Sequence, residues 1–156
     1  MTGVAEPGGA GLARPMLDCR DMSKSIPAVR KYMTTNPITF EPSLTLTEAQ
    51  GVMKDKHIRH LPVCEGDKVV GIVSDGDLYR ASALTGADPS KLALRDVMVG
   101  KPYTVSPEAP VDEVVGEMAA KKYGSAVVVD NGHVVGVFTA TDALGAFADL
   151  LHTRLR

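Results

Sequence analysis

Several features that would place a chain in a special class are missing from these 156 residues. Tryptophan is absent, aromatic residues make up 4%, and the formal net charge is −2, so a nucleic acid finds little stacking surface or positive charge. The two cysteines make no disulfide framework, and no apolar run approaches the roughly 18 residues that a membrane-spanning helix needs. We therefore expect a cytoplasmic protein with no nucleic-acid or membrane partner.

The amino-terminal stretch is rich in Gly and Pro and has no apolar periodicity, which is typical of a disordered leader. We place this leader at residues 1–25. Charged residues and prolines interrupt it, so it is a poor secretion signal. The chain as a whole, with 44% hydrophobic and 23% charged residues, has the composition of an ordinary globular domain.

The rest of the chain contains an internal duplication. A shift of 65 positions lays residues 29–81 on residues 94–146 without a gap, and 15 of these 53 positions are identical. The identities are spread over the whole length and include glycines and prolines, which mark turns and close approaches of the backbone. We therefore predict two repeats, at residues 26–86 and 87–156.

Each copy reads as a β-α-β-β-α unit, with a tight turn between its two consecutive strands. The dipeptide Asn131-Gly132 favours a hairpin turn with positive φ at both residues. A unit of about 50 residues buries too little surface to be stable alone, so we expect an α/β fold in which the repeats pack with pseudo-two-fold symmetry. The expected extended pieces are 38–40 and 103–105, the strand pairs are 60–64 with 69–73 and 126–129 with 134–138, and the closing helices are 75–84 and 140–151.

The same seven-residue pattern joins the last strand of each copy to its closing helix: Gly, two apolar residues, Ser or Thr, two variable residues and Asp. The hydroxyl of Ser74 or Thr139 would cap the helix, whose first-turn amides form an anion site. The carboxylate of Asp77 or Asp142 suits the two hydroxyls of a ribose, so the pattern predicts a nucleotide. The alternative is a pair of ordinary capping boxes without a ligand.

These features resemble the cystathionine-β-synthase (CBS) domain, and the pair resembles a Bateman module. The marks are VRKYMTTNPITF and VVGIVSDGDL in the first copy, with LRDVMVGKPYTV and VVGVFTATDAL in the second. The resemblance covers about residues 28–150 and implies a stand-alone regulatory module, not an enzyme, that binds AMP, ADP or ATP and modulates a partner protein. Two alternatives stay open: a structural or protein-interaction module without a nucleotide, and a sensor of another adenosyl ligand such as S-adenosylmethionine or NAD.

The resemblance also implies which residues surround each ligand, because the start of one repeat crosses over to line the pocket of the other. The wall expected beside Ser74 and Asp77 consists of Lys101, Pro102 and Tyr103. The wall expected beside Thr139 and Asp142 consists of Asn36, Pro37 and Ile38.

The chain departs from the family pattern between the hydroxyl residue and the Asp, where many members carry a basic residue. Asp75 stands there in the first copy and would repel a phosphate, so we prefer the site of Asp142. Positive charge would come from Arg59 and His60, which the resemblance places facing phosphates at the module centre, or from Lys121-Lys122. The histidines and cysteines lack zinc-site spacing, so we predict no metal.

The last predicted helix carries a broad apolar stripe. Only part of it can cover the sheet of its own repeat, and monomers rarely leave a large apolar patch uncovered. We therefore expect a homodimer with Phe147 or Leu151 at or beside the interface. The stripe consists of Leu144, Phe147, Leu150, Leu151 and, if the helix continues, Leu155.

Overall fold

The computed structural model describes residues 25–84 and 86–155, so the predicted leader lies outside the described residues except for Ser25. The helices of this part are α1 (Leu46–Lys56), α2 (Asp75–Leu84), α3 (Val111–Lys121) and α4 (Ala140–Arg154). Its strands are β1 (Thr34–Thr35), β2 (His60–Glu65), β3 (Lys68–Ser74), β4 (Val99–Gly100), β5 (Thr104–Val105), β6 (Ser125–Asp130) and β7 (His133–Thr139). Short 3-10 helices, η2 (Val29–Lys31) and η3 (Leu94–Asp96), stand at the start of each repeat.

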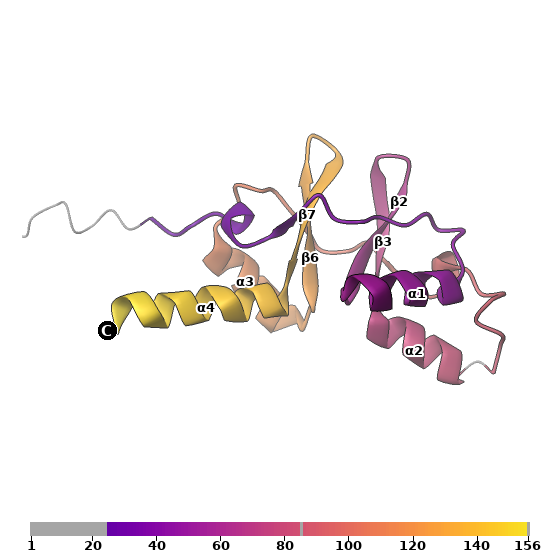
Figure 1. Ribbon diagram of the computed structural model, residues 1–156. Coiled ribbons are helices and arrows are strands. Elements are labelled where there is room, and N and C mark those ends of the chain that lie inside the picture. The colour runs from indigo at the N-terminus through magenta and orange to yellow at the C-terminus, as the bar shows by residue number, and fades with distance from the viewer. Residues whose placement is uncertain (1–24, 85, 156) are drawn as a thin grey trace, which may run out of the picture.

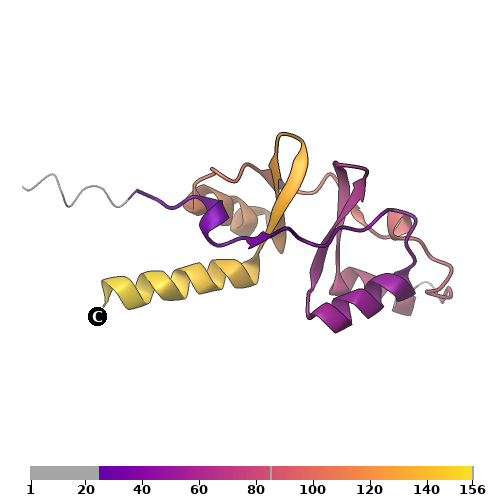
Figure 2. The same cartoon turned by 45° about the horizontal axis from the view of Figure 1, so that its top comes forward.

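The hairpins β2–β3 and β6–β7 stand side by side at the centre of the molecule, with the helices outside them (Figures 1 and 2). One sheet has the strand order β2-β3-β4 and the other has the order β1-β7-β6-β5. Helices α1 and α2 accompany the first sheet, α3 and α4 accompany the second, and β7 contacts β2 and β3 across the centre. The expected α/β fold of two β-α-β-β-α repeats related by a pseudo-two-fold axis is confirmed.

Alternation along the strands divides the apolar side chains between two kinds of core. On β2, Leu61 and Val63 belong to the cluster formed with α1 and α2. Pro62 and Cys64 consequently point to the opposite face, toward the second sheet, and all four residues are buried. Strand β6 shows the same alternation in the second repeat. Each hairpin therefore supports a helix layer on one face and the other repeat on the other face.

The turn of the second hairpin has the predicted geometry, with φ of 49° at Asn131 and 80° at Gly132. The extended piece expected at 38–40 pairs with a strand through Phe40 alone, by a single parallel β-bridge to Val63. Its counterpart in the second repeat is the two-residue strand β5, parallel to β6. Prolines on both sides of these pieces remove backbone donors, which limits how far the strand pairing can extend.

The start of each repeat crosses to the other repeat and pairs with its sheet. β1 is antiparallel to β7, with Thr35 opposite Gly136, and β4 is antiparallel to β3, with Gly100 opposite Gly71. Val29 is fully buried in the core of the second repeat. The sequence pattern did not predict β1 and β4 as strands, because two-residue strands carry no periodicity.

Glycine is required where these crossing segments pass. A Cβ atom on Gly136 would lie 2.5 Å from Met33 Sδ, and one on Gly71 would lie 2.5 Å from Met98 Sδ. Both distances are far below van der Waals contact, so a side chain at either position would push the crossing segment off the sheet. The two glycines therefore hold equivalent places in the two repeats.

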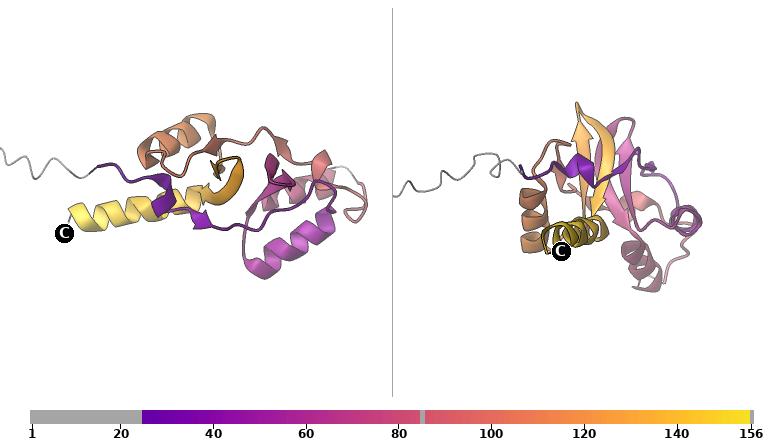
Figure 3. Two further views of the ribbon diagram at one scale, coloured as in Figure 1. Left: turned by 90° about the horizontal axis from the view of Figure 1, so that it is seen from above. Right: turned by 60° about the vertical axis from the view of Figure 1, so that its left-hand side comes forward.

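Helix α4 continues away from β7 and leaves the body of the second repeat (Figure 3). None of its described residues is buried, and Leu144 and Phe147 are 68% and 56% exposed. Ala143 is its contact with the second core. Over residues 25–84 and 86–155, no helix combines the length and the apolar character needed to cross a membrane.

Candidate functional site

The junction of β7 and α4 holds the carboxylate predicted to bind a ribose. Asp142 Oδ2 accepts a hydrogen bond from the Thr139 backbone N–H at 2.8 Å and one from the Thr139 hydroxyl at 3.0 Å. In return, the Asp142 N–H bonds Thr139 Oγ1 at 3.3 Å, which completes a capping box. Both contacts of the carboxylate use the same oxygen, Oδ2. Among the described residues, Asp142 Oδ1 has no hydrogen-bond partner, so capping leaves one oxygen open for a ligand.

A pocket of about 850 Å³ opens beside this carboxylate, a volume within the usual range for small-molecule sites. Seven predicted site residues line it together: Asn36, Pro37, Ile38, Arg59, His60, Thr139 and Asp142. They come from the crossing segment after β1, from the start of β2 and from the start of α4. The residues predicted to surround one ligand, which come from both repeats, therefore line one pocket in the structure. Ligand binding by these residues stays a prediction.

Two left-handed residues direct the backbone toward this pocket. Asn36, with φ of 47°, follows β1 and donates its N–H to the Val135 carbonyl at 3.2 Å, which ties the pocket wall to β7. His57, with φ of 54°, ends α1 and turns the chain so that Ile58 and Arg59 line the pocket. Asn is among the residues that adopt this conformation at low cost.

His60 lies at the centre of the module, where β2 begins. It is opposite Ser74 in the sheet, and its Nε2 atom lies 3.0 Å from the position that a Cβ on Gly124 would take. Burial lowers the pKa of His60 below its usual 6.5, and Arg59 acts in the same direction. The carboxylates of Asp75, Asp77 and Asp142 oppose this shift. His60 is therefore surrounded by charged groups from both candidate sites.

The junction of β3 and α2 repeats the capping arrangement in the first repeat. Asp77 Oδ2 accepts from the Ser74 N–H at 3.0 Å, and the Asp77 N–H donates to Ser74 Oγ at 3.1 Å. Here the second oxygen is occupied, because Arg80 Nη2 lies 2.5 Å from Asp77 Oδ1. The two carboxylates thus cap their helices in the same way. They differ in the second oxygen, which Arg80 bonds in Asp77 and which no described residue bonds in Asp142.

The wall predicted beside Ser74 and Asp77 follows β4, as the wall of the Asp142 pocket follows β1. Lys101, with φ of 54°, holds the place of Asn36, and Pro102 follows it. The Tyr103 ring stacks on Tyr123, with 5.4 Å between ring centroids. Burial raises the pKa of Tyr103 above its usual 10.

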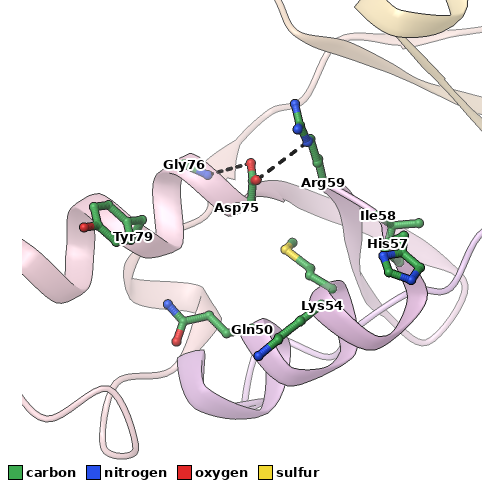
Figure 4. Close-up of a pocket in the computed structure, with 9 residues that line it drawn as sticks. Gln50, Lys54, His57, Ile58, Arg59, Asp75, Gly76 and Tyr79 are labelled. Atoms are coloured by element: carbon green, nitrogen blue, oxygen red, sulfur yellow. Dashed lines mark hydrogen bonds and ion pairs between the residues drawn. The ribbon is translucent and has the colours of Figure 1, made fainter.

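Asp75, which was expected to repel a phosphate, makes two contacts at the start of α2. Its Oδ1 accepts from the Gly76 N–H at 2.8 Å, and its Oδ2 lies 4.0 Å from Arg59 Nε (Figure 4). These contacts stand at the edge of a second hollow, of about 670 Å³, between α1 and α2. Lys54 and Tyr79 also line it. Because Arg59 lines both this hollow and the Asp142 pocket, Asp75 competes with a ligand for a cation of the preferred site.

The family model for the CBS domain matches this sequence twice, at residues 29–84 and 94–149. The chain belongs to the CBS domain family. The match confirms the resemblance drawn from the repeated motifs, and the CBS domain pair is a regulatory module. Both matches begin at the crossing segments, so each sequence repeat includes residues that lie in the core of the other repeat.

Known proteins that resemble this chain include an enzyme of which the chain spans only a part, and CBS proteins of similar length. Inosine-5'-monophosphate dehydrogenase of Korarchaeum cryptofilum is 31% identical over 89% of this chain, which spans 29% of that enzyme. A Vibrio cholerae protein assigned to acetoin utilization, AcuB, is 30% identical, with a TM-score of 0.73 over 82% of this chain and 95% of its own. The CBS domain pair of protein MJ0100, solved with 5-methylthioadenosine and S-adenosyl-L-methionine, is 28% identical, with a TM-score of 0.72 over 80% of this chain and 98% of its own.

Sequence reasoning missed more than half of the pocket lining. The end of α1 contributes Lys56, and the apolar wall includes Ile58 and Val137. No sequence signal pointed to Ile58, because its counterpart at the 65-residue shift, Tyr123, was not a predicted site residue either. The lining residues that were not predicted are Thr34, Lys56, His57, Ile58, Leu61, Gly124, Val137, Ala140 and Thr141.

Proposed function

We propose that this chain is a non-enzymatic regulatory module that binds an adenine nucleotide, AMP, ADP or ATP, in the Asp142 pocket. The observation that carries the proposal is the Oδ1 atom of Asp142, which has no hydrogen-bond partner among the described residues, in a residue that lines a pocket together with apolar and cationic side chains. Ile38, Ile58 and Val137 offer a surface for a base, and Asp142 offers an acceptor for ribose hydroxyls. A helix start beside it favours a phosphate.

The charges around the pocket favour an anionic ligand over a cationic one. Lys56, Arg59 and His60 line it, and Asp142 is the one carboxylate among its described lining residues, although Asp75 also lies 4.0 Å from Arg59. A nucleotide phosphate would gain from these groups, and its negative charge would favour protonation of His60. The positive sulfonium of S-adenosylmethionine would be repelled by them.

The second candidate is S-adenosylmethionine or a related thioether nucleoside. The MJ0100 domain pair, which was solved with such ligands, supports this alternative. Both classes share the adenosine that Asp142 would hold, so the phosphate end distinguishes them. Replacing Arg59 with Gln should weaken AMP binding by about tenfold, since it removes a charge-assisted contact, and should leave S-adenosylmethionine binding unchanged or stronger.

Titration calorimetry with AMP, ADP, ATP, S-adenosylmethionine and NAD tests the proposal. Replacing Asp142 with Ala should lower the affinity for the bound ligand about tenfold to hundredfold, because a charged acceptor worth about 1.5–3 kcal/mol is lost. Asp77→Ala is the matched control, since it removes an equivalent helix cap and leaves the Asp142 pocket intact. Equal affinities in the two variants would leave both carboxylates with a capping role alone.

We further propose that the chain forms a homodimer through α4 and regulates a partner protein in that state. The support is the unpartnered apolar face of α4, where Leu150 and Leu151 remain 44% and 39% exposed. Replacing Phe147 with Glu should give a monomer mass in light scattering at micromolar concentration, while the unchanged chain gives twice that mass. A monomer mass for the unchanged chain, with and without nucleotide, would rule out the dimer.

A further inference from the structure

The two candidate sites, at Asp77 and at Asp142, carry the same capping box, and they differ in what holds the second carboxylate oxygen. At the first site, Arg80 holds Asp77 Oδ1 at 2.5 Å. At the 65-residue shift the counterpart of Arg80 is Gly145, which has no side chain to reach Asp142. The difference therefore comes from one position on the closing helix, three residues after each aspartate.

The same guanidinium lies beside the start of α2. Arg80 Nη1 lies 3.9 Å from the position that a Cβ on Gly76 would take, and the Arg80 side chain is 67% exposed. The carboxylate that it holds is partly shielded, with 21% of the Asp77 side chain exposed. A ribose that approaches Asp77 would have to share Oδ1 with this charge-assisted bond or displace it.

The apolar end of the first site differs as well. The second site has Ile38 and Ile58 in its wall, and at the 65-residue shift these positions are Tyr103 and Tyr123. The two tyrosine rings stack on each other. A base entering here would have to separate a stacked pair, whereas the isoleucines leave their space open as part of the pocket.

From these observations we infer that Arg80 closes the Asp77 site to nucleotides, and that the absence of a side chain at Gly145 keeps the Asp142 site open. The module then binds one nucleotide per chain, although both repeats carry the Ser/Thr-x-x-Asp signature. The inference rests on the proposed function, since it concerns which of two sites takes the ligand. The residue that determines which site binds the nucleotide, Arg80 or Gly145, lies outside the Ser/Thr-x-x-Asp signature.

Exchanging the two residues tests the inference. Gly145→Arg places the guanidinium beside Asp142, at an exposed position where a new side chain meets nothing within 4 Å. Gly145→Ala is the control, because it changes helix propensity in the same direction without adding a charge. Calorimetry with AMP should give one site per chain for the unchanged protein, an affinity about tenfold to hundredfold lower for Gly145→Arg, and no loss for Gly145→Ala.

The reverse exchange uses Arg80→Gly combined with Tyr103→Ile in the Asp142→Ala background, where the second site is already impaired. This variant should regain a titratable AMP site. Two sites per chain in the unchanged protein, or full affinity in Gly145→Arg, would overturn the inference and leave the proposed function standing. The absence of AMP binding by the unchanged protein and by the reverse exchange alike would refute the proposed function together with the inference.

Discussion

Replacing Gly136 with Ala should weaken both folding and ligand binding, whereas replacing Gly71 with Ala should weaken folding alone. The two glycines are equivalent in the duplication, and each lies under the segment that crosses from the other repeat. The segment over Gly136 continues into the wall of the Asp142 pocket at residues 36–38. The segment over Gly71 continues into the wall predicted beside Asp77, where Arg80 bonds the carboxylate and Tyr103 stacks on Tyr123.

The expected loss of stability follows from the contacts of the added methyl group. At Gly136 it would lie 2.5 Å from Met33 Sδ and 3.0 Å from the Thr34 carbonyl oxygen. At Gly71 the corresponding distances, to Met98 Sδ and the Val99 oxygen, are 2.5 and 3.0 Å. The methionine can rotate, but the carbonyl belongs to a short strand pair. Overpacking of this kind costs about 1–3 kcal/mol, and the near-equal contacts predict near-equal losses.

Urea denaturation and calorimetry with AMP separate the two effects. Gly136→Ala should bind AMP about tenfold more weakly than Gly71→Ala, because displacing β1 moves the Asn36–Ile38 wall. Both titrations are made at a temperature where denaturation shows each variant to be folded. Equal affinities at equal stability would show that the crossing segment does not form the ligand wall.

Two further predictions concern single residues. Because burial holds the pKa of His60 below 6.5, the unfolded chain takes up its proton more readily, so the free energy of unfolding should fall as the pH drops from 6.5 toward that lowered pKa. Denaturation curves of the unliganded protein should show less of this slope in His60→Gln, and an unchanged slope would assign it to other groups. Gly132→Ala, at a φ of 80°, should cost about 1–2 kcal/mol in the same assay, and no cost would contradict the strained turn.

Local patterns accounted for most of the fold. In the structure Thr45 and Glu48 form a capping box at the start of α1, as Thr139 and Asp142 do at the start of α4, and the Asn131-Gly132 turn joins the strands of the second hairpin. Each of these depends on residues within a few positions of one another, which a sequence displays directly. The duplication added the long-range part, because two equivalent units of this size must bury their sheets against each other.

The parts that could not be predicted depend on contacts between distant or chemically ordinary residues. Burial of Val29 in the core of the second repeat leaves no periodic trace, since η2 and β1 are each two or three residues long. In the sequence, Lys56 is an ordinary charged residue near the end of a helix. In the structure, the end of α1 and the left-handed turn at His57 lie at the pocket, and Lys56 lines it. Arg80 and Asp77 are three residues apart on a helix, a common spacing for exposed ion pairs, so nothing in the sequence connects this pair with a binding site.

The two aspartates show why a shared signature does not establish a shared ligand. A capping box uses one carboxylate oxygen and the backbone, and both repeats satisfy it with nearly the same distances. Selection for helix stability alone would therefore keep Ser/Thr-x-x-Asp in both copies, whatever each site binds. The second oxygen is free of that constraint, so its surroundings can differ: Arg80 holds it in one copy, and among the described residues nothing holds it in the other. On the inference above, the residue three positions after the aspartate, Arg80 or Gly145, determines which repeat binds the nucleotide. The aspartate itself does not distinguish the two repeats.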